Sequence, residues 1–283
     1  MKDVFKTAVE NIPSPPGYVE GDYYKDGLLH CGKCHTNKQK RISQMIGGDK
    51  YEKIVGCVCQ CEERTYLEEK KRHEMMEREI RIERLRSTSM LDKTFRNSRF
   101  SRYAVHDDNK SVYELAVKYA GGFDRMYKEN QGLVLYGPCG TGKSFTAACI
   151  ANELMEKERS VIMTSFVKVL QILNGKQIEE TDFVNSLMTV DLLILDDLGT
   201  ERDTNFALEK VYNVIDSRVR SERPMIITTN VPLEDMMGET DIRYQKVYDR
   251  IFSCCYPVEV GGKSFRIEEA ARRFDNMKKF MEE

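Results

Sequence analysis

The stretch LVLYGPCGTGKS, from Leu133 to Ser144, decides the fold of this chain of 283 residues. It joins a short apolar run to the pattern G-x-x-x-x-G-K-[S/T], and a segment of helical period follows. Glycines at these positions let successive backbone N–H groups point at one phosphate, and the positive end of the next helix adds a partial charge. We therefore expect a nucleotide to bind at the loop and the residue after it: Gly137, Pro138, Cys139, Gly140, Thr141, Gly142, Lys143, Ser144 and Phe145.

Two side chains of this loop have distinct expected roles. Lys143 should reach the β and γ phosphates, and the hydroxyl of Ser144 should bind Mg²⁺. The remaining magnesium ligands would be phosphate oxygens, water and a carboxylate on a neighbouring strand.

The rest of the chain after Gln131 alternates short apolar runs with segments of helical period. Apolar runs without polar alternation predict parallel strands that are buried on both faces. The sequence thus predicts an α/β fold, a P-loop domain whose parallel sheet lies between helices. The expected strands are 133–136, 161–165, 192–196, 225–229 and 256–260, and the expected helices are 144–157, 166–173, 181–188, 204–221, 241–253 and 268–281.

Polar residues follow two of these strands. Asp196 and Asp197 end the run 192–196, at the edge where open α/β sheets bind ligands, and we assign Asp196 to magnesium. Asp197 is either the base that orients water or a turn residue, with Glu201 as the reserve base. Asn230 ends the run 225–229 and could bind the attacking water or the γ phosphate, or form a turn.

The first part of the chain has a different composition. Five of the nine cysteines lie between residues 31 and 61, which favours a metal site over disulfides in a segment too polar to fold alone. Cys31-x-x-Cys34 is a standard Zn²⁺ knuckle, whereas the second half of the site must come from Cys57, Cys59 and Cys61, with His30 or His35 as possible substitutes.

A charged helix follows the cysteines. Residues 62–86 contain eight Glu, eight Lys or Arg and no Gly or Pro, with several Glu-to-Arg pairs four residues apart. We expect three parts: a zinc-binding module at 1–61, a charged linker helix at 62–90 and an ATPase domain at 91–283.

The charge balance limits the partners. Lys and Arg number 44 against 46 Asp and Glu, so any nucleic-acid contact must be local. Residues 91–103 mix basic and aromatic side chains, which could stack on single-stranded DNA but would more simply pack beside the adenine. No run approaches the roughly 18 apolar residues of a membrane helix, and a secretory signal is absent from the first residues, so we expect a cytoplasmic protein with no membrane partner.

Four stretches together resemble a known group: GPCGTGKS, LLILDDLGTERD, ITTN and KVYDRIFSCCYPVEVGGKSFR. In this order they resemble the DnaC/DnaI-type replicative helicase loaders of the AAA+ superfamily, including phage members, and the related IstB-type transposition ATPases. The resemblance covers about residues 95 to 275.

The resemblance implies an AAA+ fold, ATP and Mg²⁺ as cofactors, assembly into an open ring or spiral, and placement of the replicative helicase on single-stranded DNA. It implies that the N-terminal module grips the helicase, and that the C-x-C of such relatives, here Cys59 and Cys61, completes the zinc site. The alternatives are an IstB-like helper of a transposase, or a simple ATPase without a DNA role.

Two arginines also take roles from the resemblance. Arg250 in VYDRI corresponds to the arginine finger, which reaches the γ phosphate bound by the adjacent subunit, so a lone subunit should be a weak ATPase. Its alternative is a surface arginine paired with a neighbour such as Asp249. Arg266 in GKSFR matches the second sensor, which contacts phosphate in the same subunit, or it is a plain strand residue.

Overall fold

The computed structural model describes residues 18–46, 49–174, 180–199 and 205–282. Contacts divide the chain into two compact units, Met1–Glu79 and Ile80–Glu283. The boundary falls inside one helix, α2 (Gln60–Thr88), which extends two residues beyond the charged run 62–86 at each end and stops two residues before the end of the predicted linker helix 62–90. The domain bounds 1–61, 62–90 and 91–283 remain a prediction.

The first unit contains two antiparallel hairpins before α2. Strands β1 (Tyr23–Lys25) and β2 (Leu28–His30) form the first, and β3 (Gln39–Ile46) and β4 (Asp49–Gly56) form the second. Among its described residues only a few apolar side chains are buried, namely Leu29, Cys31, Val55 and Cys59. So small a core agrees with the expectation that this segment needs a staple.

The second unit is built on a parallel sheet of five strands, which confirms the predicted fold class. The strand order is β6-β7-β8-β5-β9, so the strand before the P-loop lies between β8 and β9. The strands are β5 (Gly132–Tyr136), β6 (Val161–Ser165), β7 (Leu192–Leu198), β8 (Met225–Thr229) and β9 (Cys255–Glu259).

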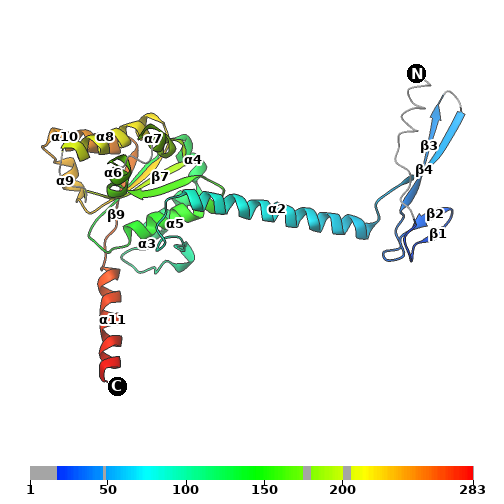
Figure 1. The fold of residues 1–283 in the computed structure, drawn as a ribbon, viewed down its shortest axis with the longest axis horizontal. Coiled ribbons are helices and arrows are strands. Elements are labelled where there is room, and N and C mark those ends of the chain that lie inside the picture. The colour runs from blue at the N-terminus through cyan, green and yellow to red at the C-terminus, as the bar shows by residue number, and fades with distance from the viewer. Residues whose placement is uncertain (1–17, 47–48, 175–179, 200–204, 283) are drawn as a thin grey trace. The chain divides into compact units, whose positions relative to one another are not determined.

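Helices cover both faces of this sheet, as Figure 1 shows. On one face α3 (Lys110–Gly121), α4 (Phe123–Lys128) and α5 (Lys143–Glu156) enclose one cluster of buried side chains, which includes Leu133, Leu135 and Ile194. On the other face lie α6 (Phe166–Asn174), α7 (Glu180–Thr189), α8 (Asn205–Arg220) and α10 (Ile242–Phe252). Alternate residues of each strand therefore enter two separate cores.

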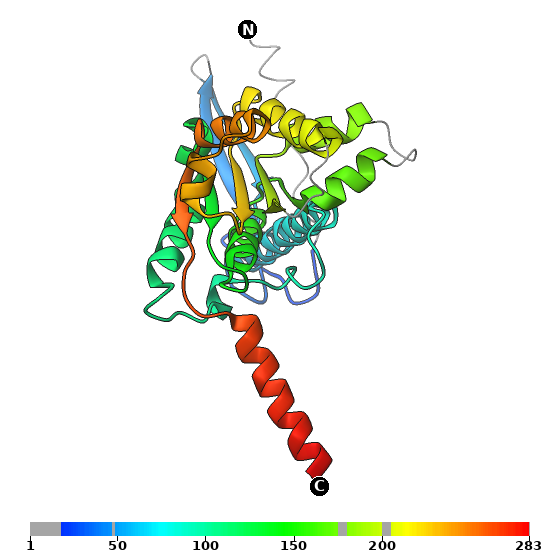
Figure 2. The ribbon, with the colours of Figure 1, turned by 90° about the vertical axis from the view of Figure 1, so that its left-hand side faces the viewer.

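The remaining helices are short or peripheral. A single 3₁₀ turn, η1, spans Phe100–Arg102, and α9 spans Leu233–Met237 beside α10. The last helix, α11 (Phe265–Glu282), has no buried residue, and in Figures 1 and 2 no other described element of its unit lies along it. No helix in the described parts of the chain combines the length and the apolar character needed to cross a membrane.

Every predicted strand and helix of the second unit is present, with ends that differ by at most three residues. Helices α3, α4 and α9 and the two hairpins of the first unit were not predicted from the sequence.

Candidate functional site

The P-loop connects the end of β5 to the first turn of α5. Gly137 has φ 137°, and a Cβ atom built there would lie 2.6 Å from the carbonyl oxygen of Val260. Only glycine can take this backbone conformation beside the chain that leaves β9. Gly142 caps α5 in the left-handed region, so the loop ends at the positive end of a helix of 14 residues.

Lys143 is the first residue of that helix and is buried. Its Nζ atom donates to the carbonyl oxygens of Gly137 at 2.8 Å and Pro138 at 2.7 Å. Burial lowers the pKa of the ammonium group. The two carbonyl oxygens hold the ammonium group beside the loop. Phosphate oxygens of a bound nucleotide would compete with these carbonyls for the ammonium group.

The carboxylate of Asp196 faces this loop from β7. Its side chain is hydrogen-bonded to Ser144, and its Oδ1 atom accepts a 2.6 Å bond from the Thr228 hydroxyl. Burial raises the pKa of Asp196. A half-buried carboxylate and the hydroxyl of a P-loop serine are a suitable pair of ligands for Mg²⁺.

Asp197 lies at a bulge in β7. The register between β7 and β8 shifts between Leu195 and Leu198, and Asp197 takes φ 57° there. Its N–H donates to the Thr228 hydroxyl at 2.9 Å, so one threonine holds both the backbone of the bulge and the carboxylate of Asp196. Thr228 was missed by the sequence analysis, which singled out only the asparagine that ends the same stretch.

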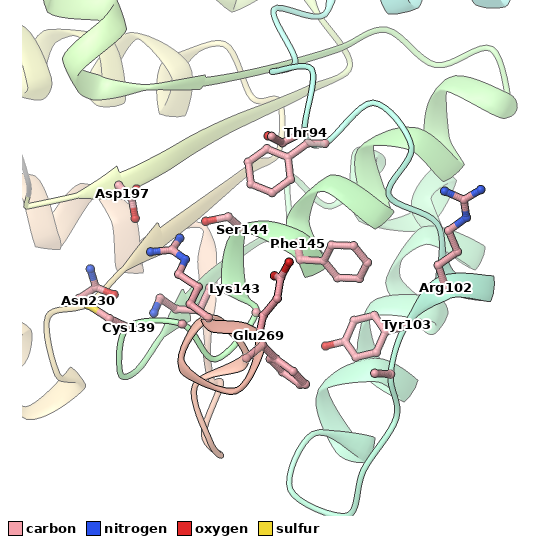
Figure 3. A pocket seen from close by; sticks show the side chains of 16 residues that line it. Thr94, Arg102, Tyr103, Cys139, Lys143, Ser144, Phe145, Asp197, Asn230 and Glu269 are labelled. Carbon is pink, nitrogen blue, oxygen red and sulfur yellow. The ribbon is translucent and has the colours of Figure 1, made fainter. Parts of the chain in front are cut away.

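Most of the side chains predicted to surround the phosphates open onto one cavity of about 590 Å³. Asp196 is not among the residues that line it, and neither are Gly137, Pro138 and Thr141. Figure 3 shows Lys143, Asp197 and Asn230 on one side of it and Phe145, Tyr103 and Arg102 on the other. Cys139, Gly140, Gly142 and Ser144 also line it. The reserve base Glu201 lies outside the described residues.

The segment before α3 forms the far wall of this cavity. Thr94, Phe95, Arg102 and Tyr103 line it, and the Tyr103 hydroxyl is 2.8 Å from the Thr146 hydroxyl. The Tyr103 ring also packs against Phe145 with 5.6 Å between ring centroids. These contacts favour packing beside a base over stacking on DNA, since the aromatic side chains already have partners within the chain.

Helix α11 contributes the last wall. Phe265, Arg266 and Glu269 line the cavity, and the N–H of Phe265 donates to the carbonyl of Gly140 at 3.0 Å. Arg266 is the second residue of a helix, so its interpretation as a plain strand residue was wrong. A guanidinium in this position can contact phosphate of the same chain.

Arg250 is not among the residues that line the cavity of its own chain. It lies on α10, where its Nε atom is 2.9 Å from Asp216 Oδ1 on α8, and a hydrogen bond with Tyr212 raises its pKa. The surface pairing considered above therefore exists, but with Asp216 in place of Asp249. The side chain keeps 39% of its surface exposed, so a neighbouring molecule could reach it.

Four cysteines of the first unit gather in one group. The sulfurs of Cys31, Cys34, Cys59 and Cys61 all lie within 4.8 Å of one another, and these are the four that the resemblance implies. Thiolates at about 2.3 Å from a tetrahedral Zn²⁺ would be about 3.8 Å apart, so the group fits this ion. Cys57 is separate, because its thiol donates to the carbonyl of Asn37 at 3.2 Å.

Local interactions shift the pKa values of these thiols in opposite directions. A hydrogen bond with the Thr36 hydroxyl lowers the pKa of Cys34 to about 5, while burial raises the pKa of Cys59 to about 12. The carboxylate of Asp22 accepts from the N–H of Gly32, inside the knuckle, and from Lys38 Nζ at 2.9 Å. Neither Asp22 nor its ion pair with Lys38 was predicted from the sequence, although both side chains are buried.

Comparison with known proteins finds similarity to ATP-binding proteins, two of which are named replicative helicase loaders. The sequence model of the family described as IstB-like ATP binding protein matches residues 50–272. The "Replicative helicase loader DnaC" of Escherichia coli (strain K12) is 27% identical over 179 residues, which are 62% of this chain and 71% of that protein. The "Replicative helicase loader DnaI" of Bacillus subtilis (strain 168) is 31% identical over 161 residues, 51% of each chain.

Solved structures support the fold. The crystal structure of a DnaC helicase loader has a TM-score of 0.54 at 20% identity and covers 60% of this chain and 100% of that one. The crystal structure of DnaI has a TM-score of 0.52 at 23% identity, over 62% of this chain and 93% of that one.

Proposed function

This chain belongs to the family of IstB-like ATP binding proteins, and from that premise we propose that it is an ATP-dependent loader of the replicative helicase. In this proposal it places the helicase on single-stranded DNA when replication begins, and it acts in the cytoplasm. The observation that carries the proposal is the similarity to a replicative helicase loader over 179 residues, together with the P-loop and acidic strand end that the structure brings together.

The nucleotide would lie in the 590 Å³ cavity with its phosphates over the P-loop. Lys143 and the loop N–H groups would hold the β and γ phosphates, and Arg266 would contact them from α11. Ser144 and Asp196 would hold Mg²⁺, which supplies charge neutralisation between the phosphates. The rings of Tyr103 and Phe145 would flank the base.

Hydrolysis in a single subunit would be weak. Asp197 and Asn230 both line the cavity and could orient a water molecule, but the side chain of Asp197 is short for a base. Arg250 would complete the site from a neighbouring subunit, where such a cation contributes on the order of 10³ to 10⁵ in rate. Self-association into a ring or spiral, with or without single-stranded DNA, would therefore stimulate turnover.

The N-terminal unit would bind the helicase. The four cysteines would hold Zn²⁺, and the metal would supply the folding free energy that the small apolar core lacks. Four cysteine sulfurs that already lie close together support this assignment, and so does the buried Asp22–Lys38 pair next to the knuckle.

A second candidate is an IstB-like ATPase that assists a transposase. The description of the matching family favours it, because that family takes its name from IstB. The two functions differ in the protein that is bound, so partner capture separates them.

The test is co-purification with a replicative helicase and, in parallel, with a transposase. The loader predicts ATP-dependent capture of the helicase alone, loss of capture in a Cys31→Ser, Cys34→Ser variant, and normal capture in the matched Cys57→Ser variant. Capture of the transposase without the helicase would contradict the proposal.

A further inference from the structure

One carboxylate in the wall of the nucleotide cavity has no part in the proposed phosphate chemistry. Among the described residues, two acids line this cavity, Asp197 and Glu269. Asp197 follows the magnesium ligand on β7 and is placed to orient water, whereas Glu269 comes from α11. A carboxylate repels a triphosphate, so Glu269 is suited to a different part of the nucleotide.

Helix α11 sets the position of Glu269 in the cavity. The helix begins against the P-loop, where the N–H of Phe265 donates to the carbonyl of Gly140 at 3.0 Å. Arg266 and Glu269 are three residues apart, so they share a face of the helix and lie about 4.5 Å apart along its axis. The face that turns Arg266 toward the phosphates therefore turns Glu269 toward the part of the nucleotide that comes next.

The close view of the cavity agrees with this position. Figure 3 shows the side chain of Glu269 between Lys143 and Ser144, at the phosphate end, and Phe145 and Tyr103, at the expected base end. In a nucleoside triphosphate the group between the phosphates and the base is the ribose. Glu269 thus lies level with the ribose of a nucleotide whose phosphates occupy the P-loop.

The hydrogen-bonding groups of ATP point to the same contact. An ionised carboxylate only accepts hydrogen bonds. The ionised phosphates of ATP also only accept, so the donors that ATP offers are the two ribose hydroxyls and the amino group of adenine. The amino group is at the edge of the base remote from the ribose, which leaves the hydroxyls as the donors level with Glu269.

Glu269 keeps an acceptor for this contact. Its Oε1 atom accepts a hydrogen bond from Arg273, one turn further along α11. Its Oε2 atom has no hydrogen-bond partner among the residues that the structure describes. The pair with Arg273 therefore holds the carboxylate by one oxygen and leaves the other available to a ligand.

We propose that Glu269 accepts a hydrogen bond from the ribose hydroxyls of the bound nucleotide and makes the site selective for ribonucleoside triphosphates. The inference rests on the proposed binding of ATP in this cavity. A carboxylate has the same use in dinucleotide-binding folds, where it binds a ribose hydroxyl. Such a contact separates ATP from dATP, because the two differ in one hydroxyl alone.

The experiment measures the affinity of the full chain for ATP, 2′-deoxy-ATP and 3′-deoxy-ATP by calorimetric titration with Mg²⁺. Wild type should bind at least one of the deoxynucleotides about tenfold more weakly than ATP, as expected for the loss of one hydrogen bond to a charged acceptor. Glu269→Ala should bind the three nucleotides with affinities within about twofold of one another.

The matched control is Glu268→Ala, which removes the same charge from the adjacent residue of α11. Glu268 lines another cavity, with His106 and Lys263, and not the nucleotide cavity. This variant should keep the wild-type preference for ATP. A general loss of charge, or of the pair with Arg273, changes the affinities for ATP and dATP equally and leaves their ratio unchanged.

Three results would overturn the inference: a wild-type chain that binds both deoxynucleotides as tightly as ATP, a Glu269→Ala variant that keeps the preference, or a Glu268→Ala variant that loses it. None of these measurements uses a helicase. A chain that prefers ATP but captures no helicase would refute the loader function alone, whereas a chain that binds ATP without a ribose preference would refute the role of Glu269 alone.

Discussion

Replacing Thr228 by valine should loosen the magnesium site without changing the shape of the strand that carries it. The threonine hydroxyl is fully buried, donates to Asp196 Oδ1 at 2.6 Å and accepts from the N–H of Asp197 at 2.9 Å. Hydrogen bonds to charged groups contribute about 1.5–3 kcal/mol, and a buried donor without a partner costs about 1–3 kcal/mol. Because one hydroxyl serves both groups, we expect a loss of about 2–4 kcal/mol in the free energy of unfolding.

The effect on nucleotide chemistry is more specific than the loss of stability. Partners that orient a metal ligand are typically worth about 10- to 100-fold in metal affinity or activity. ATP hydrolysis measured against Mg²⁺ concentration should therefore show a half-saturating concentration about 10- to 100-fold higher in Thr228→Val, and recovery in Thr228→Ser. The chain supplies a control in Thr229→Val, which removes the neighbouring buried hydroxyl and its 2.8 Å bond to the carbonyl of Leu198.

The control should lose stability but keep the magnesium dependence of wild type, because the Thr229 hydroxyl bonds to the backbone of Leu198 and Val231 and not to Asp196 or Asp197. An unchanged magnesium dependence in Thr228→Val, or an equal shift in Thr229→Val, would refute the reasoning.

Three further predictions concern other parts of the chain. Arg250→Ala should bind ATP as tightly as wild type but lose the rise of specific hydrolysis rate with protein concentration, and an Arg250→Ala protein with the wild-type concentration dependence would exclude the finger role. Removing metal with a chelator, or replacing Cys59 by Ser, should unfold the first unit as followed by circular dichroism, whereas Cys57→Ser should leave it folded. A first unit that stays folded without metal would show that zinc is not needed for its stability. Hydrogen bonds from Arg243 lower the pKa of Asp241 from 3.8 to about 2. The charged carboxylate therefore stabilises the folded chain above pH 3.8, and this contribution is lost as the pH falls through about 2. The melting temperature of wild type should exceed that of Asp241→Asn at pH 5, and the two melting temperatures should converge near pH 2.

The second unit was largely predictable because its strands are buried on both faces. A continuous apolar run such as Leu192 to Leu195, in a chain that alternates such runs with helical segments, is typical of a strand buried on both faces, and each of the five runs forms a strand. The P-loop and Asp196 were found for the same reason, since each follows directly from the end of a strand. The four cysteines that the structure gathers were also named in advance, although the choice among three in the second half came from a resemblance and not from spacing.

The residues that the sequence analysis missed act through tertiary contacts. Thr228 and Thr229 are indistinguishable in the sequence ITTN. In the structure the strands shift register at the bulge of β7, and it is Thr228 that donates a hydrogen bond to Asp196. Arg218 looks like a surface residue within SRVRSER, yet it is fully buried and donates to the carbonyl oxygens of Leu187, Met188, Val190, Asp191 and Pro224. A buried guanidinium that satisfies backbone carbonyls leaves no periodic signal in a sequence.

The central claim is that residues 137–144 and Asp196 bind ATP with magnesium, and calorimetric titration of the full chain tests it most directly. The account predicts one ATP per chain in the presence of Mg²⁺ and no measurable binding by Lys143→Ala, whose circular dichroism spectrum should match that of wild type. A wild-type chain that takes up no ATP, or a Lys143→Ala variant that binds it equally well, would contradict the account.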